Sequence, residues 1–362
     1  MTQDRLTKLQ DRMREANVDL VAIGPTANMQ YLLGFAPHAD ERVCLLLVRP
    51  DDVRMVAPGL NCAEIAAHMN VELVPWEDVE GPQTALRSAL GSQTNLGVLA
   101  VDGATRADFL VHLQANVTTQ KTVSADSLVA TLRQCKSADE IELLAQAAAQ
   151  ADQAMQAAVD ACRVGTTESE IAWAAEAAFR KHGADVVDFT IVATGANGAF
   201  PHHHAGNTQL KNGDAIVIDI GATYRGYKSD ITRMVHLGAP TPEFTRAYAA
   251  VREANQRAMS VVRPGITAEE IDRVAREVLE LAGYGQYFTH RTGHGIGLDG
   301  HELPWIMHGN KIVLEEGMTF SIEPGVYFVG QYGIRIEDIV AVTKTGVHNL
   351  TGFSQDLAVR KG

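Results

Sequence analysis

The 362-residue sequence has little cysteine, a shortage of positive charge and no long hydrophobic run. Its four cysteines are isolated, because none forms a Cys-x-x-Cys pair or has a partner at metal-ligand spacing. We therefore interpret all four as reduced thiols with a structural role; they are Cys44, Cys62, Cys135 and Cys162.

Positive charge is scarce, because the sequence has 31 Lys and Arg residues against 44 Asp and Glu residues, which gives a formal net charge of -13. A nucleic-acid or anionic-membrane partner would require a basic face. The charge balance therefore predicts no nucleic-acid and no membrane partner, and it favours small molecules or small peptides as ligands.

The sequence contains no run of about 18 apolar residues, the length needed to span a bilayer. Its start, Met-Thr-Gln-Asp-Arg, is mostly polar and leads into a helical pattern without the apolar core of a signal peptide. We therefore expect a cytoplasmic location.

The length predicts two domains, each large enough to bury its own core. In residues 1–135, helical stripes such as Leu6, Leu9 and Met13 alternate with short apolar runs typical of strands. This alternation predicts an α/β N-terminal domain. Because it has no pattern typical of catalysis, we expect it to contribute assembly or access to a cleft. The expected strands are 19–23, 43–48, 53–57, 72–74 and 96–101.

A capping box at Ser137 and Glu140 predicts the start of a long Ala-rich helix and of a second domain, residues 136–362. The segment 163–171 contains a second capping box, and it matches 263–271 at five of nine positions, with a long helix before each. The match predicts two structurally related halves; chance repetition of capping residues is the alternative. Expected strands follow at 189–193, 215–220 and 230–237, and at 318–327 and 334–342.

Two pairs of carboxylates stand where hairpins would bring them together. Asp219 and Asp230 lie opposite each other, about 5 Å apart, if the turn centres on Tyr224 and Arg225. Like charges so placed repel, which makes a bridging cation the natural explanation. The two halves of the second domain would face each other across a cleft, where we place the chemistry.

Glu323 and Glu337 pair in the same way if their loop centres on Gly330. Burial of these carboxylates without a partner would cost several kcal/mol. Arg335, two residues before Glu337 and on the same strand face, is positioned to pair with one of the carboxylates.

His294 lies in an expected turn, Thr292-Gly-His-Gly-Ile-Gly297, whose glycines allow close approach to a ligand. Four carboxylates and one imidazole form a mainly hard oxygen set. Such a set suits two divalent ions, Mn, Co or Zn, better than a thiolate-bound structural zinc.

These motifs resemble the pita-bread metallopeptidases, the family of aminopeptidase P, Xaa-Pro dipeptidase (prolidase) and methionine aminopeptidase, with creatinase as a metal-free relative. The resemblance runs from about Ser137 to the end, and 28–35 (Asn-Met-Gln-Tyr-Leu-Leu-Gly-Phe) is similar to the creatinase-type N-terminal domain. It implies an α/β creatinase-type domain followed by an α+β pita-bread domain with pseudo-twofold related halves. It also implies two metal ions, with Asp230 and Glu337 bridging; the implied ligands are Asp219, Asp230, His294, Glu323 and Glu337.

Two further histidines match family motifs that line the substrate cleft. His202, in Phe-Pro-His, and His301, in His-Glu-Leu-Pro, are implied to stabilise the tetrahedral intermediate or shuttle a proton to it. The adjacent His203 and His204 are expected to be exposed loop residues.

Trp305 departs from the family pattern. In typical dipeptidases of the family an arginine directly after His-Glu-x-Pro holds the free carboxylate of the dipeptide, and a tryptophan cannot make that bidentate contact. We place Trp305 among the substrate-binding residues, and both dipeptidase and aminopeptidase P-like activities stay open.

The expected function is hydrolysis of the amide bond preceding proline by a metal-bridging hydroxide, with Glu323 as general base. The alternatives are a creatinase-like hydrolase of a small non-peptide amide or amidine, and a non-catalytic binding protein on the same fold. The resemblance also implies a homodimer, in which His38, on the loop after Phe35, reaches across to the partner's substrate.

Overall fold

The computed structural model describes residues 2–361, which form two compact units, one ending at Arg133 and the other beginning at Gln134. None of the helices in this part of the chain is both long enough and apolar enough to cross a membrane.

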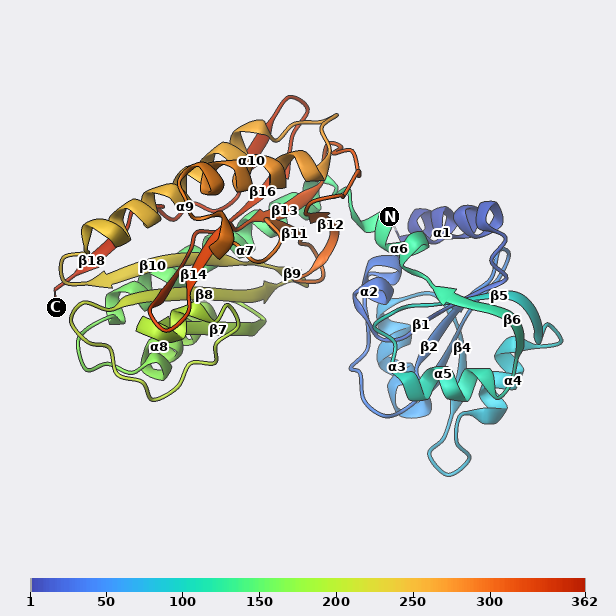
Figure 1. The fold of residues 1–362 in the computed structure, drawn as a ribbon. Coiled ribbons are helices and arrows are strands. Elements are labelled where there is room, and N and C mark those ends of the chain that lie inside the picture. The colour runs from blue at the N-terminus through green and yellow to red at the C-terminus, as the bar shows by residue number, and fades with distance from the viewer. Residues whose placement is uncertain (1, 362) are drawn as a thin grey trace. The chain divides into compact units, whose positions relative to one another are not determined.

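The N-terminal unit is built on one six-stranded sheet, in the order β4-β3-β2-β1-β5-β6. Its strands are β1 (Leu20–Ile23), β2 (Leu45–Val48), β3 (Val53–Pro58), β4 (Glu72–Trp76), β5 (Asn95–Val101) and β6 (Thr118–Ser124). Its helices are α1 (Thr2–Ala16), α2 (Ala27–Leu33), α3 (Gly59–His68), α4 (Gln83–Leu90), α5 (Ala107–Gln114) and α6 (Asp126–Arg133). Helices α1 and α6 lie on one face of the sheet and α4 and α5 on the other (Figure 1).

Burial explains which of these strands the sequence predicted. Every residue of β1 and β2 is buried, so both read as continuous apolar runs. Strand β6 was not predicted, because it lies at the sheet edge with a polar, mostly exposed sequence. The predicted α/β class of this unit is confirmed.

The C-terminal unit consists of two halves that each begin with a pair of long helices. The helices are α7 (Ala138–Ala161), α8 (Glu168–Lys181), α9 (Pro242–Val261) and α10 (Ala268–Leu281), with short 3-10 helices at Gly195–Ala199 and Gly285–Tyr287. The strands of the first half are β7 (Val186–Thr194), β8 (Ala215–Tyr224), β9 (Tyr227–Lys228) and β10 (Ile231–Leu237). The later strands are β11 (Gly293–Gly295), β12 (Glu302–Ile306), β13 (Thr319–Ile322), β14 (Gly325–Phe328), β15 (Tyr332–Arg335), β16 (Asp338–Val342), β17 (Val347–Asn349) and β18 (Ala358–Arg360).

The strands of this unit form two main sheets. One has the order β18-β10-β8-β7, with β9 paired to β8, and the other has the order β12-β11-β13-β16-β17. Strands β14 and β15 form a separate hairpin. The last strand, β18, pairs in parallel with β10, so the end of the chain returns to the sheet of the first half.

The turns between the paired helices confirm the predicted internal repeat. Gly165, with φ of 88°, donates its backbone N–H to the Leu210 carbonyl at 2.9 Å. Gly265, with φ of 91°, donates in the same way to the Leu314 carbonyl at 2.9 Å. The two halves therefore share one local design, as an α+β pita-bread domain requires.

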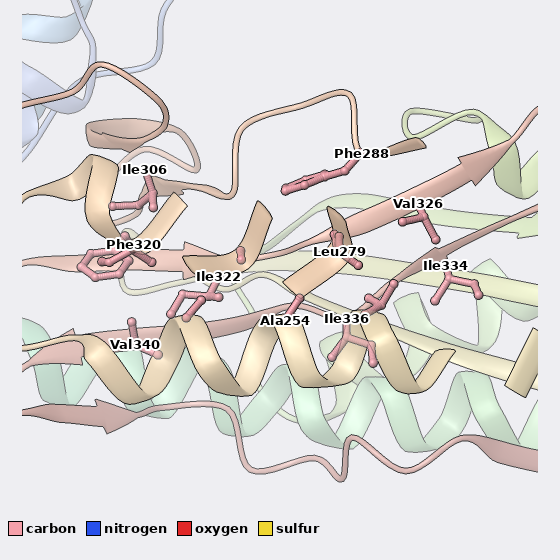
Figure 2. Close-up of a cluster of buried hydrophobic side chains, with 14 of the residues drawn as sticks. Ala254, Leu279, Phe288, Ile306, Phe320, Ile322, Val326, Ile334, Ile336 and Val340 are labelled. Atoms are coloured by element: carbon pink, nitrogen blue, oxygen red, sulfur yellow. The ribbon is translucent and has the colours of Figure 1, made fainter. Parts of the chain in front are cut away.

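A shared hydrophobic core connects the second half to the first. Figure 2 shows Phe320, Ile322, Ile336 and Val340 beside the helix that carries Ala254, which is α9. The same cluster includes Val217 of β8 and Met234 of β10, two strands of the first half. The strands that carry the candidate site are thus fixed by packing on both sides.

Candidate metal centre

The hairpin of β8, β9 and β10 supplies two acidic residues, but not in the predicted register. Thr232, not Asp230, lies opposite Asp219. The turn centres on Arg225 and Gly226, with φ of 49° and 85°, and two positive φ values suit the twist of a two-residue hairpin turn. The prediction that the two aspartates pair directly was therefore wrong by two residues.

Asp230 nevertheless approaches Asp219, because the chain leaves the ladder after β9. A Cβ on Gly221 would lie 2.5 Å from the Ser229 carbonyl oxygen, so only glycine admits the backbone just before Asp230 so closely. One oxygen from each of Asp219, Asp230 and Glu337 falls within 4.8 Å of the others. The two aspartates therefore lie close together as predicted, but diagonally across the hairpin and not directly opposite each other.

The second hairpin has the predicted register. Val326 pairs with Ile334 and Phe328 with Tyr332, which centres the loop on Gly330. The two long strands expected here are each interrupted where the acidic residues lie, between β13 and β14 and between β15 and β16.

The interruptions arise because the backbone of both glutamates bonds to other segments. The Glu323 N–H donates to the Thr292 carbonyl at 2.8 Å, and Pro324, which follows, has no N–H to donate. The Glu337 N–H donates to the Thr232 carbonyl at 3.2 Å. Glu323 is thereby tied to the segment before His294, and Glu337 to the aspartate hairpin.

His294 lies in the short strand β11, not in the expected turn. A Cβ on Gly293 would lie 1.9 Å from the Ser321 carbonyl oxygen, so glycine permits the close packing of β11 on β13. The His294 Nε2 atom lies 3.3 Å from Glu323 Oε1 and 3.8 Å from Asp230 Oδ2. Its Nδ1 lies 3.1 Å from the Gly295 carbonyl, which leaves Nε2 directed at the carboxylates.

The electrostatics of this cluster favour a bound cation. Asp219 Oδ1, Asp230 Oδ1 and Glu337 Oε1 are buried and have no hydrogen-bond partner within residues 2–361. Burial, and then the neighbouring carboxylates, hold the pKa of Asp230 and Glu337 well above the usual range. Leaving such oxygens buried and unpaired is costly, and a divalent ion among them removes the cost.

The two other ionisable donors are suited to the same role. Burial raises the pKa of Glu323 to about 7, and burial lowers the pKa of His294 to about 3. His294 is therefore a neutral imidazole at pH 7, which is the form that binds metals. The donor set fits divalent ions.

Arg335 forms the predicted pair with a carboxylate of the cluster. Its Nη2 donates to Asp219 Oδ2 at 2.5 Å, while Nη1 donates to the Tyr327 hydroxyl at 2.9 Å and Nε to Thr232 Oγ1 at 3.0 Å. Thr232 in turn donates to Glu337 Oε2 at 2.7 Å. The side chains beyond the acidic residues thus orient them.

A pocket of about 910 Å³ opens onto this cluster, with all of its lining residues between Asp188 and Glu337. His202 and His301, the two histidines expected to contact the substrate, both line this pocket. The His301 ring lies 3.9 Å from the His294 ring, centroid to centroid. Both histidines are exposed, so they can meet a substrate at the pocket wall.

Two expectations about neighbouring residues need correction. Trp305 is not among the residues that line the pocket; it is half-buried in β12, opposite His294, and its ring packs under the Arg291 guanidinium. His203 is half-buried and pairs with the fully buried Glu168 at 2.9 Å, so it is a structural residue and not a solvated one.

Comparison with known proteins identifies the family of the chain. Residues 142–344, more than half of the chain, match metallopeptidase family M24. The chain belongs to metallopeptidase family M24. Residues 5–135 of this M24 chain match the creatinase/prolidase N-terminal domain. The family makes the chain a metallopeptidase and implies divalent metal ions.

Similar proteins cover nearly the whole M24 chain. It is 33% identical to the Xaa-Pro dipeptidase of Pyrococcus furiosus, over 98% of this chain and 99% of that protein. It is 36% identical to the probable dipeptidase PepE of Mycobacterium tuberculosis, over 95% and 93%. The crystal structure of a dipeptidase from Pyrococcus horikoshii OT3 superposes with a TM-score of 0.93, at 35% identity, over 98% of this chain and 100% of that one.

Three residues of the M24 site escaped the sequence analysis. Thr232 and Tyr327 were missed because a lone hydroxyl residue within an apolar strand carries no specific signal. His290, whose Nε2 lies 2.9 Å from the Tyr327 hydroxyl, stands four residues before His294. That spacing was a signal that could have been used.

Proposed function

We propose that this M24 chain hydrolyses the amide bond preceding proline in small peptides, using two divalent ions. The observation that carries the proposal is the set of three buried, unpartnered carboxylate oxygens beside a neutral histidine, at the base of a pocket. The Xaa-Pro specificity is supported by the relatives that bear this name and align over nearly the full length.

The arrangement of the donors supports two ions in place of one. Asp219, Asp230 and Glu337 form one group of ligand atoms within 4.8 Å, and His294, Glu323 and Glu337 form another. Glu337 belongs to both groups, as a bridging ligand would, and Asp230 also recurs in a group with His294. Mixed carboxylate and imidazole donors suit Mn, Co or Zn.

The chain's own residues would divide the chemistry as follows. Two bound divalent ions would supply charge that acidifies water and polarises the scissile carbonyl. Glu323, held by a hydrogen bond from the Ser321 hydroxyl at 3.2 Å, can accept the proton of the attacking water. His202 and His301, at the pocket wall, can donate hydrogen bonds to the developing oxyanion and pass a proton to the prolyl nitrogen.

The creatinase-like and the non-catalytic alternatives receive no support from the site. Both would tolerate the loss of metal-binding side chains, whereas all five predicted donors are present and converge.

The test is an assay of Ala-Pro, Ala-Ala and Ala-Pro-Ala after metal removal and reloading with Mn, Co or Zn. We expect turnover of the proline peptides that requires metal and a much lower rate on Ala-Ala. Metal-independent turnover, or no turnover of any proline peptide with any of the three metals, would contradict the proposal.

The proposal includes a cytoplasmic homodimer. Within residues 2–361 all four cysteines are free thiols, as suits a reducing compartment. His38 is exposed on the segment after α2, where a partner chain could receive it. Sedimentation should give twice the chain mass, and His38→Ala should raise the KM for Ala-Pro; a monomer with an unchanged KM would contradict this part.

A further inference from the structure

Three lysine and arginine side chains line the pocket, and two of them are already paired. Arg335 is bonded to Asp219, and Lys228 Nζ lies 2.7 Å from Asp188 Oδ1. Arg291 differs from both, because within residues 2–361 its guanidinium forms no ion pair and makes its hydrogen-bond contact with His301. Among the lysine and arginine side chains of the pocket, Arg291 is therefore the one without a carboxylate partner in residues 2–361.

Neighbouring rings fix the position of Arg291. Its guanidinium carbon lies 4.3 Å from the centre of the Trp305 ring, and its Nη2 lies 3.3 Å from His301 Nδ1. Stacking on one face leaves the edge of a guanidinium available for a bidentate contact with a carboxylate. Arg291 is half-buried, so a charge pair formed there is only partly screened by water.

Arg291 also lies at a suitable reach from the candidate metal ligands. It touches His301, whose ring lies 3.9 Å from that of His294. In a dipeptide, the terminal carboxylate belongs to the residue directly after the scissile carbonyl. The Cα atoms of these two residues are about 3.8 Å apart, so the carboxylate lies close to the scissile bond. The chain of contacts from His294 through His301 to Arg291 is also short.

We propose that Arg291 binds the free C-terminal carboxylate of a dipeptide substrate, and that Trp305 positions Arg291 by stacking. This inference rests on the proposed function and deepens it, because it names substrates with a free carboxylate one residue after the scissile bond. Trp305, which cannot bind a carboxylate itself, supports the residue that does.

The test compares Ala-Pro with Ala-Pro amide, which differ only in the terminal charge, in the Mn-loaded enzyme. We expect the wild-type enzyme to have a kcat/KM about 10- to 100-fold higher for the acid, as one charge-assisted bidentate contact provides. Arg291→Gln should raise the KM for Ala-Pro by a similar factor and leave the KM for the amide within about threefold.

Matched variants separate charge, stacking and folding. Arg257→Gln removes an exposed arginine of α9 and should leave both substrates unaffected. Trp305→Phe keeps a ring and should retain most of the preference for the acid, whereas Trp305→Leu should lose it. In the Arg291→Gln background, Trp305→Leu should cause no further loss of that preference. Thermal melting of each variant reports whether it is folded.

The outcomes distinguish this inference from the proposed function. Equal wild-type kcat/KM for acid and amide, or an equal fall of kcat on both in Arg291→Gln, overturns the role of Arg291 and leaves Xaa-Pro hydrolysis standing. Absence of wild-type turnover on both substrates overturns the proposed function, and the inference with it.

Discussion

At the scale of single residues, Thr232 connects the two acidic hairpins. Its hydroxyl accepts from Arg335 Nε at 3.0 Å and donates to Glu337 Oε2 at 2.7 Å, and Arg335 continues to Asp219. One hydroxyl thus takes part in orienting a carboxylate in each proposed ligand group. Side chains that hydrogen-bond to metal ligands commonly orient those ligands and thereby affect the affinity for the metal.

Replacing this hydroxyl tests its role. Thr232→Val keeps the shape of the buried side chain but removes the donor and the acceptor, so the affinity for Mn should fall about 10- to 100-fold. Thr232→Ser, which keeps the hydroxyl, should bind Mn nearly as the wild type does. Calorimetric titration of the metal-free proteins measures both, and equal affinities for Thr232→Val and the wild type would contradict the role.

Lys136 and Glu302 form a buried ion pair next to His301. Lys136 Nζ lies 2.6 Å from Glu302 Oε1, and their side chains are only 3% and 6% exposed. Lys136→Met leaves a buried carboxylate without this partner, which should cost about 3–5 kcal/mol in free energy of unfolding. Urea denaturation measures the loss.

A solvent-exposed lysine pair provides the control for Lys136. Lys311 pairs with Glu269, and the Lys311 side chain is 75% exposed. Lys311→Met should change the free energy of unfolding by less than about 1 kcal/mol. If Lys136→Met and Lys311→Met lowered the free energy of unfolding by comparable amounts, burial would not be what makes the Lys136–Glu302 pair stabilising.

At the scale of helices, the two repeated turns differ in one capping bond. The Thr167 hydroxyl accepts from the Glu170 N–H at 3.2 Å and completes a capping box. Within the described residues, the Thr267 hydroxyl forms no such bond at the start of α10. The two threonines are equivalent in sequence but not in function, which gives a matched pair for mutation.

Thr167→Ala should therefore destabilise the chain more than Thr267→Ala. The first removes a satisfied N-cap and should cost about 1 kcal/mol in free energy of unfolding, whereas the second should cost a few tenths. Chemical denaturation monitored by circular dichroism compares them. A larger loss for Thr267→Ala would contradict the assignment of the capping bond.

The strands show which features of the site were predictable. The register of the Glu323 and Glu337 hairpin followed from a symmetric loop around Gly330, which the structure confirms. The aspartate hairpin was misplaced by two residues, because Arg225 adopts a positive φ that arginine rarely takes, and no residue type signalled it. Interruption of the strands at the glutamates depends on partners distant in the chain, which periodicity cannot reveal.

At the scale of the whole molecule, the two-domain fold was predictable because buried strands and long capped helices give strong local signals. The convergence of the metal-binding side chains was predictable as well, because acidic residues, which are rarely buried alone, stood in strand sequences that were otherwise apolar. The Arg291 and Trp305 contact was not, because the two residues come from segments whose pairing only the folded sheet defines.

Metal binding should stabilise the C-terminal unit, which contains all of the proposed ligands. Each ion at about 100 times its Kd adds roughly 2.7 kcal/mol to the stability of the folded state, and each kcal/mol raises the Tm of a unit of this size by about 2–4 °C. Scanning calorimetry with EDTA or Mn should show this shift. Asp230→Asn should reduce it, and a wild-type Tm that does not respond to Mn would contradict stabilisation by metal.

Diffraction at the manganese absorption edge, from crystals grown with Mn, tests the central claim most directly. We predict two anomalous peaks, one contacted by Asp219 and the other by His294 and Glu323, with Asp230 and Glu337 shared between them. A map without peaks among these five side chains, or with manganese bound only elsewhere, would contradict the two-metal peptidase site.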